Sequence, residues 1–287
     1  MSVISTPTPE TWRRRPGRRG RGGRGGFLRT RTGTWLVRAV TFAVVIGVWQ
    51  VYGSAVNRAL FAPASAVAAA AIDQLTGHPS ILEPLVTSFA AFFLGTGIGV
   101  LVGIPLGLLV GRSRSVEFVL DPYVTFLYVI PSVAFVPLFV LWFGFDFKFQ
   151  TALVVESTIF PMMINAAAGA KNVEADLVDG GRSFGASQWQ IMRTIILPGS
   201  LPLVFAGLRI AFSSAWVGVV VAQMTGALTG LGGLIKIYST TFQTANMLVP
   251  ILVIMAVGVL IHALTSRLLV RLTPWHQPDA EMSEENA

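Results

Sequence analysis

The chain has 287 residues, of which 53% are hydrophobic and 12% are charged, and its mean hydropathy is +0.67. Soluble domains carry about 25% charged residues, so this composition excludes a soluble globular protein and indicates a membrane protein. There is no cysteine, which excludes disulfides and thiolate metal sites, and the three histidines are scattered, so we expect no metal site.

Both ends of the chain are predicted to lie outside the transmembrane domain as tails. Residues 13–26 consist of seven Arg, six Gly and one Pro, and such a segment cannot bury a core, so we expect 1–33 to be a disordered basic tail. It can set topology, bind anionic lipid or contact RNA. The first two interpretations are favoured, and no nucleic-acid partner is expected. Residues 277–287 are acidic and are expected to be mobile, which leaves 34–276 as the transmembrane domain.

Six segments are apolar over enough residues to cross a bilayer as helices of about 20 residues. Their approximate limits are 35–55, 86–110, 126–144, 149–170, 203–226 and 248–270. With an even number of spans, eighteen Lys and Arg fall on the side of the termini and three on the other side. The positive-inside rule therefore places both termini and the 171–202 loop in the cytoplasm. We predict an all-α membrane protein of about six spans.

The segment before the second span and the second span itself carry packing signals. Pro63 and an alanine-rich run indicate an amphipathic or re-entrant helix within 57–85. A glycine at every fourth position lets another helix approach closely, and packing within the monomer is favoured over a special dimer face. These helix-packing residues are Gly95, Gly99, Gly103 and Gly107.

The third and fourth spans carry candidate residues of a path. Ile130-Pro131 and Val136-Pro137 interrupt the third span at membrane depth. Irregular backbone is tolerated there only where protein or a water-filled cavity covers it, so Pro131 and Ser132 are candidate lining. Glu156, within the fourth span, is either a path residue or a partner of Lys148, and the sequence leaves both interpretations open.

The cytoplasmic loop before the fifth span is predicted to hold two short helices around a glycine turn. Gly185 can adopt a positive φ and end the first helix. Ser187 can cap the second helix, with Gln190 completing a capping box. Leu197 precedes Pro198, which predicts that the second helix stops there. Its apolar face would combine four residues at helical spacing: Trp189, Met192, Ile195 and Ile196.

The fifth span is predicted to begin at Ser200-Leu201-Pro202, since proline favours the first turn of a helix. Three polar or amphipathic residues within it, Ser213, Trp216 and Gln223, share one helical face. We expect them to line the same path as the residues of the third and fourth spans.

The 171–202 loop resembles the cytoplasmic "EAA" loop of ABC-importer permeases, whose pattern is E-A-A-x3-G-x9-I-x-L-P. Gly185, Ile195, Leu197 and Pro198 match it, and Asp179-Gly180-Gly181 stands in place of Glu-Ala-Ala. The resemblance implies a coupling helix that inserts into a cleft of an ATPase. The residues expected in this coupling loop, 174–198, are Asp179, Gly180, Gly181, Gly185, Ala186, Ser187, Trp189, Ile195, Leu197 and Pro198.

The stretch 129–144 resembles the nitrate, sulfonate and taurine branch of these permeases, and the likeness covers roughly 60–276. Tyr128 replaces an Arg of that pattern and Gln223 replaces a Glu. The resemblance implies a type I importer fold in the bacterial plasma membrane. It also implies a second permease copy, two ATPase subunits that hold ATP and Mg²⁺, and an extracellular solute-binding protein. The solute itself would be small: the resemblance favours a sulfonate, nitrate or taurine, followed by pyrimidine, thiamine-precursor or flavin-like solutes, and the sequence does not identify it.

The chain is not expected to be an enzyme or to bind a cofactor. A Walker A motif needs Gly before its Lys, whereas the three lysines follow Phe147, Ala170 and Ile235. Two other classes remain as alternatives. One is an ion-coupled secondary transporter that uses Glu156, although no internal repeat is evident. The other is a membrane anchor that recruits a partner through the same loop.

Overall fold

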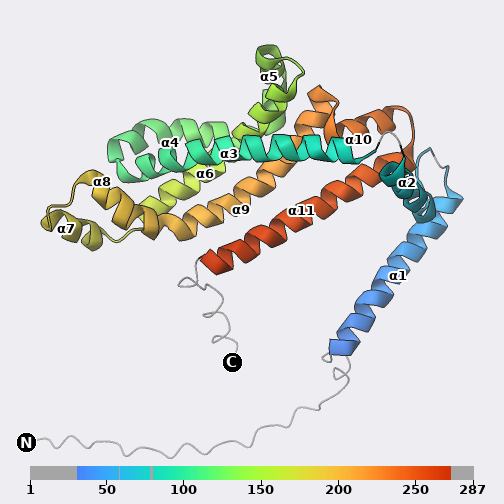
Figure 1. Ribbon diagram of the computed structural model, residues 1–287, viewed down its shortest axis with the longest axis horizontal. Helices are drawn as coiled ribbons and strands as arrows, with labels where there is room; N and C mark the ends of the chain where they lie inside the picture. Colours follow the sequence, from blue (N-terminus) through green and yellow to red (C-terminus); the bar gives the residue numbers. More distant parts are fainter. Residues whose placement is uncertain (1–30, 58, 78–79, 273–287) are drawn as a thin grey trace, which may run out of the picture. The chain divides into compact units, whose positions relative to one another are not determined.

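The computed structural model describes residues 31–57, 59–77 and 80–272, and within these ranges it contains helices and no strand (Figure 1). The predicted all-α class is confirmed. Residues 1–30 and 277–287 of the two predicted tails lie outside the described residues, as does Arg58. The chain divides at Trp49 and Gln50 into two compact units, and the second holds every element discussed below except most of α1, Arg31–Ala55.

The number of apolar helices agrees with the prediction. Five are long and apolar enough to span a membrane: Thr34–Ala55, Leu82–Arg112, Phe147–Lys171, Gln188–Ala227 and Thr244–Leu268. A sixth span results if Arg114–Val129 and Ser132–Phe143 are counted together, although they meet at a bend of 94°. About six spans are therefore present in the described part of the chain, and the cytoplasmic placement of the termini stays a prediction.

The third span is broken at the first of its two predicted positions. Helix α4 (Arg114–Val129) ends at Ile130, which is extended at φ −68° and ψ 125° as expected before a proline. A 3₁₀ turn, η1 (Ser132–Phe135), leads directly into α5 (Val136–Phe143). The predicted interruption at Val136-Pro137 is wrong, because Pro137 lies in the first turn of α5, where its missing N–H costs nothing.

The core forms where α3 (Leu82–Arg112), α6 (Phe147–Lys171) and α9 (Leu197–Ala222) pack together. The glycine stripe of α3 faces α6 of the same chain. A β-carbon added at Gly99 would lie 2.6 Å from Thr158 Cβ, and one at Gly103 would lie 2.9 Å from the carbonyl oxygen of Ile159. Gly95 and Gly107 make equivalent close approaches to α6. The stripe therefore lets the two backbones approach within the monomer.

One helix continues from the cytoplasmic loop into the fifth span. Helix α8 (Gln188–Ile191) passes through a π turn, η2 (Met192–Ile196), into α9, and a second π turn, η3 (Gln223–Ala227), follows α9. The predicted stop at Leu197 is wrong, since Leu197 is helical at φ −59° and ψ −50° and its N–H bonds to Met192 O. The predicted start at Ser200-Leu201-Pro202 is also wrong. Pro198 follows the π turn and therefore lies within the continuous helix and not at its beginning.

Short helices close the end of the bundle opposite the loop. Helix α2 (Ala64–Thr76) lies within the segment predicted to hold an amphipathic helix, and it packs on α11 (Thr244–Leu272), where Gln74 Nε2 donates to Asn246 O at 3.0 Å. Helix α10 (Gly230–Thr240) packs against α3 and α11. Helix α9 packs against both α3 and α11, and Figure 1 shows these three helices.

Candidate functional site

The loop 174–198 is a short helical hairpin closed by Gly185. Helix α7 (Ala175–Ser183) ends in a Schellman motif, in which Gly185 N donates to Arg182 O at 2.9 Å and Ala186 N donates to Gly181 O at 3.1 Å. Gly185 has φ +79°, so its predicted left-handed conformation is confirmed. Because only glycine adopts this conformation without a steric cost, the residue type fixes the turn.

The second helix of the hairpin begins with the predicted capping box. Gln190 N donates to Ser187 Oγ at 3.3 Å, and Ser187 N donates to Gln190 Oε1 at 2.8 Å. The pair satisfies two backbone donors that would otherwise lack partners at the helix N-terminus. The Schellman motif and the capping box together make the hairpin rigid at both sides of its turn.

The apolar residues of the loop divide into two groups. Ile191 and Ile196 are buried in one cluster with Val178 of α7, and Ala186, Met192, Ile195 and Leu197 pack against that cluster. Trp189 is 72% exposed, so the prediction that it shares one apolar face with Met192, Ile195 and Ile196 is wrong. The buried side of α8 carries Ile191, and two residues of an α-helix correspond to about 200° of rotation, so Trp189 points away from that side.

Two exposed aromatic residues therefore mark the outer surface of the hairpin. Phe184, which sequence reasoning missed, is 94% exposed and lies beside the turn, and Trp189 lies on α8. An aromatic residue directly before a glycine turn was the signal that could have identified Phe184. Large apolar side chains held on a rigid turn are suited to filling a pocket on a partner protein.

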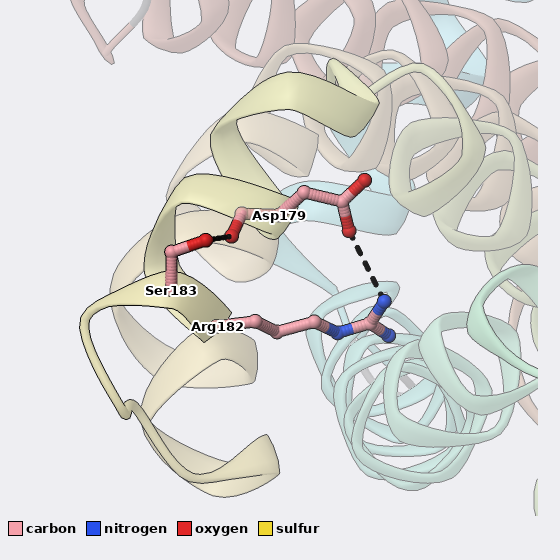
Figure 2. Close-up of polar contacts among 3 residues, drawn as sticks. All are labelled: Asp179, Arg182 and Ser183. Atoms are coloured by element: carbon pink, nitrogen blue, oxygen red, sulfur yellow. Dashed lines mark hydrogen bonds and ion pairs between the residues drawn. The ribbon is translucent and has the colours of Figure 1, made fainter.

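Asp179, Gly180 and Gly181, in α7, have different roles. A β-carbon at Gly181 would lie 2.9 Å from Ile195 Cδ1, so this glycine makes room for the packed isoleucine. Gly180 has open space around it. Asp179 Oδ1 accepts from Arg182 Nη1 at 3.1 Å, and Ser183 Oγ donates to Asp179 O at 2.9 Å (Figure 2). This exposed ion pair contributes at most about 0.5 kcal/mol, so both charges remain available to a partner.

A polar cavity lies where the broken third span meets α6 and α9. It encloses about 460 Å³. Four of the six predicted path residues line it together: Pro131, Ser132, Glu156 and Ser213. The break at Pro131 exposes the 3₁₀ turn to this space, which explains how irregular backbone is accommodated there.

The polar groups of the cavity form one cluster. Ser157 Oγ lies 3.3 Å from Glu156 Oε2 and 3.2 Å from Ser132 Oγ. Glu156 takes part in neither of the two ion pairs found among the described residues, which join Lys171 to Glu117 and Arg182 to Asp179. The pairing of Glu156 with Lys148 that the sequence left open is therefore not formed. Lys148 lines a neighbouring apolar cavity of about 610 Å³ whose wall Glu156 also reaches.

Trp216 and Gln223 lie away from this cavity. Trp216 Nε1 donates to Ile254 O of α11 at 3.1 Å, and its ring packs edge-on against Phe92 of α3. Gln223 is completely buried between α3, α6 and α10. The structure therefore does not bring these two residues together with Ser213, because α9 is surrounded by other helices on more than one side.

Gln223 is the centre of a buried hydrogen-bond network. Its Oε1 accepts from Ser88 Oγ at 2.9 Å and from Gly232 N at 3.1 Å. Its Nε2 donates to Gln150 Oε1 at 3.1 Å, and Gln150 Nε2 donates to Thr229 Oγ1 at 2.9 Å. Sequence reasoning missed Ser88, Gln150 and Thr229, although polar residues at apolar helix positions are the expected signal for such a network. The network joins three spanning helices to α10.

We expect Gly230→Ala to destabilise the protein by roughly 2–4 kcal/mol, because two costs add. Gly230 has φ +65°, which disfavours any side chain, and an added β-carbon would collide with the amide of Gln223. Gly97→Ala, on α3 with nothing within 4 Å of its added β-carbon, is the matched control. Thermal unfolding of the detergent-purified protein measures both. Equal melting temperatures for the two variants would contradict the role of the network.

Comparison with known proteins places this architecture in a family. Residues 99–276 match the model of the family described as binding-protein-dependent transport system inner membrane component. SsuC of Bacillus subtilis (strain 168), a permease protein assigned to the transport of aliphatic sulfonates, is 30% identical over 93% of this chain and 92% of its own length. The taurine transport system permease protein TauC of Escherichia coli (strain K12) is 33% identical over 69% of this chain and 72% of its own.

Solved structures show the same fold. A chain of the MetNI methionine ABC transporter, in an inward-facing conformation, superposes with a TM-score of 0.57 at 20% identity and covers 65% of this chain and 93% of its own. A chain of an amino acid ABC transporter superposes with a TM-score of 0.53 at 20% identity and covers 68% of this chain and 94% of its own. The chain thus belongs to the binding-protein-dependent transport system inner membrane components, and it is a multi-pass bacterial inner-membrane permease subunit of an ABC importer, not an enzyme.

Proposed function

We propose that this permease forms the translocation path of a small solute and couples it to a separate ATPase through the loop 174–198. The observation that carries the proposal is the continuous helix from Gln188 to Ala227, which joins the hairpin to the cavity. Trp189 lies at one end of this helix, and Ser213 lines the cavity farther along it. A displacement of the hairpin therefore changes the position of a wall of the cavity.

The hairpin supplies what a coupling element needs. Its turn is fixed by Gly185 and its second helix by the capping box, so it transmits a displacement without unfolding. The cluster around Ile191 and Ile196 anchors it to the bundle. Phe184 and Trp189 remain exposed for a cleft on the ATPase. Two states of the ATPase that differ in their contacts with this surface would bias the direction in which the path opens.

The partners follow from this assignment. ATP and Mg²⁺ would be held by the ATPase. A second copy of the chain would complete the path, and an extracellular solute-binding protein would deliver the solute. The loop would lie in the cytoplasm together with both termini, as the distribution of Lys and Arg predicts. The names of the SsuC and TauC relatives favour a sulfonate or taurine as the solute.

The test of the coupling surface removes its two exposed aromatic side chains. We expect at least tenfold less ATPase to co-purify with the double variant Phe184→Ala/Trp189→Ala than with the wild-type permease, since aromatic anchors dominate such interfaces. Phe145→Ala serves as the control, because it removes an aromatic ring that is 67% exposed and lies just before the N-terminus of α6, whereas the hairpin follows the C-terminus of α6. Quantitative mass spectrometry of the detergent-solubilised complex gives the ratio. An undiminished ATPase signal from the double variant, or no ATPase with the wild-type chain, would contradict the proposal.

A further inference from the structure

The cavity between the broken third span, α6 and α9 presents hydrogen-bond acceptors. Ser157 Oγ donates to Leu153 O at 2.9 Å, and Ser213 Oγ donates to Arg209 O at 3.2 Å. Each serine hydroxyl has a single hydrogen. That of Ser213 is directed to a carbonyl of its own helix, and that of Ser157 is shared between Leu153 O and Glu156 Oε2, which lies 3.3 Å from Ser157 Oγ. What Ser157 and Ser213 leave for a ligand are the lone pairs of their oxygen atoms.

Ser132 extends the same pattern. Its Oγ lies 3.2 Å from Ser157 Oγ, and since the hydrogen of Ser157 is shared between Leu153 O and Glu156 Oε2, Ser132 donates in this contact. The hydroxyl hydrogens of Ser132, Ser157 and Ser213 are thus directed to protein oxygen atoms. The carboxylate and the serine lone pairs form one acceptor cluster inside the membrane.

The cavity also carries a negative charge. Glu156 is the one charged side chain among the described residues that line it. Among the described residues no Lys or Arg forms an ion pair with Glu156: Lys148 lines the neighbouring apolar cavity, whose wall Glu156 also reaches, without pairing with it, and Arg209 Nη2 lies 3.1 Å from His262 Nε2 of α11. A carboxylate that a serine hydroxyl contacts but no cation pairs with attracts cations and repels anions.

From this cluster we infer that the path binds a cationic, hydrogen-bond-donating group of its solute, such as an ammonium group. The inference rests on the proposed function of the cavity as part of the path. An alkanesulfonate without an amine offers only acceptor oxygens and would face the carboxylate unfavourably. An aminoalkanesulfonate brings an ammonium group to Glu156. Tyr128 and Ser214 also line the cavity, and their hydroxyl groups are available for its anionic end.

The absence of cysteine from the whole chain allows a direct test. Ser213→Cys introduces a single thiol into the cavity of the full-length permease, purified with its ATPase and placed in lipid nanodiscs. Two methanethiosulfonates of similar size are compared, one with a trimethylammonium group and one with a sulfonate group. Each rate of modification is divided by the rate of the same reagent with 2-mercaptoethanol in solution. Ser132→Cys provides a second, independent position.

We expect the normalised rate of the cationic reagent to exceed that of the anionic reagent at least tenfold at both positions. Adding Glu156→Gln should reduce this ratio to within about twofold of unity, because the amide keeps the shape and removes the charge. Adding Glu83→Gln instead removes an exposed carboxylate at the start of α3 and should leave the ratio unchanged. Co-purification of the ATPase with each variant confirms its assembly.

The remaining outcomes separate the inference from the proposed function. Equal normalised rates, or a faster anionic reagent, would overturn the acceptor-lined path and leave the cavity as a water-accessible path. Modification by neither reagent at either position, in a protein whose thiol reacts after denaturation, would show that water does not reach the cavity. That result would overturn the path itself, and the inference with it.

Discussion

Gly185→Val should reduce ATP-driven uptake at least tenfold in a permease that is still expressed and inserted. The cause is the backbone, because Gly185 has open space around it and φ +79°. A β-branched side chain is strongly disfavoured in the left-handed region, by about 1–2 kcal/mol or more. The turn would therefore relax, and α8 would lose its fixed direction relative to α7. The ATPase would continue to hydrolyse ATP without moving the path.

Gly180→Ala is the matched control for this experiment. Gly180 also has open space around it, but it lies within α7 in helical conformation, so alanine there should preserve uptake. Uptake and ATP hydrolysis are measured on the same proteoliposomes, and their ratio reports the coupling. Normal uptake by a normally assembled Gly185→Val variant would remove the hairpin from the mechanism.

Gly107→Val is expected to prevent recovery of a folded permease, with a loss of more than about 3 kcal/mol in stability. An added β-carbon would collide with the carbonyl oxygen of Met163 and lie 2.7 Å from Ala166 Cβ, so α3 and α6 would have to separate. Their contact is the centre of the bundle, and a backbone carbonyl cannot move aside as a side chain can.

Gly97→Val tests whether position on the helix decides the outcome. Gly97 lies on α3 as well, but an added β-carbon there meets nothing within 4 Å. We expect this variant to give a monodisperse peak and a melting temperature close to that of the wild type. Gly107→Ala should fall between the two. A Gly107→Val protein that elutes and melts like the wild type would show that the two helices are not held by this contact.

The features that the sequence predicted correctly depend on few residues. The positive φ of Gly185, the capping box of Ser187 and Gln190, and the break before Pro131 are each determined by neighbouring residues, and each is confirmed. Spans of apolar residues also follow from composition, because the bilayer sets their length. The fold class was therefore accessible from the sequence.

The features that could not be predicted depend on partners far along the chain. The residue before a proline usually ends a helix, which predicts a stop at Leu197-Pro198, yet the helix continues across these residues after a π turn. Trp216 and Gln223 share a helical face with Ser213 in projection, but α3, α6 and α11 reach different parts of that face. The neighbouring helices decide which side of a buried helix faces a cavity, and a single sequence does not reveal how those neighbours are arranged around it.

The π turn at Met192–Ile196 has a consequence for the two ends of its helix. Each residue of an α-helix corresponds to about 100° of rotation and 1.5 Å of rise. A π turn holds one residue more than an α turn, so it sets an angular offset between Trp189 and the residues of α9. Deleting one residue there would leave both ends helical and rotate them against each other by about 100°. The π turn thus fixes the rotation of the proposed coupling surface relative to the cavity, and this rotation is encoded in the number of residues and not in their identity.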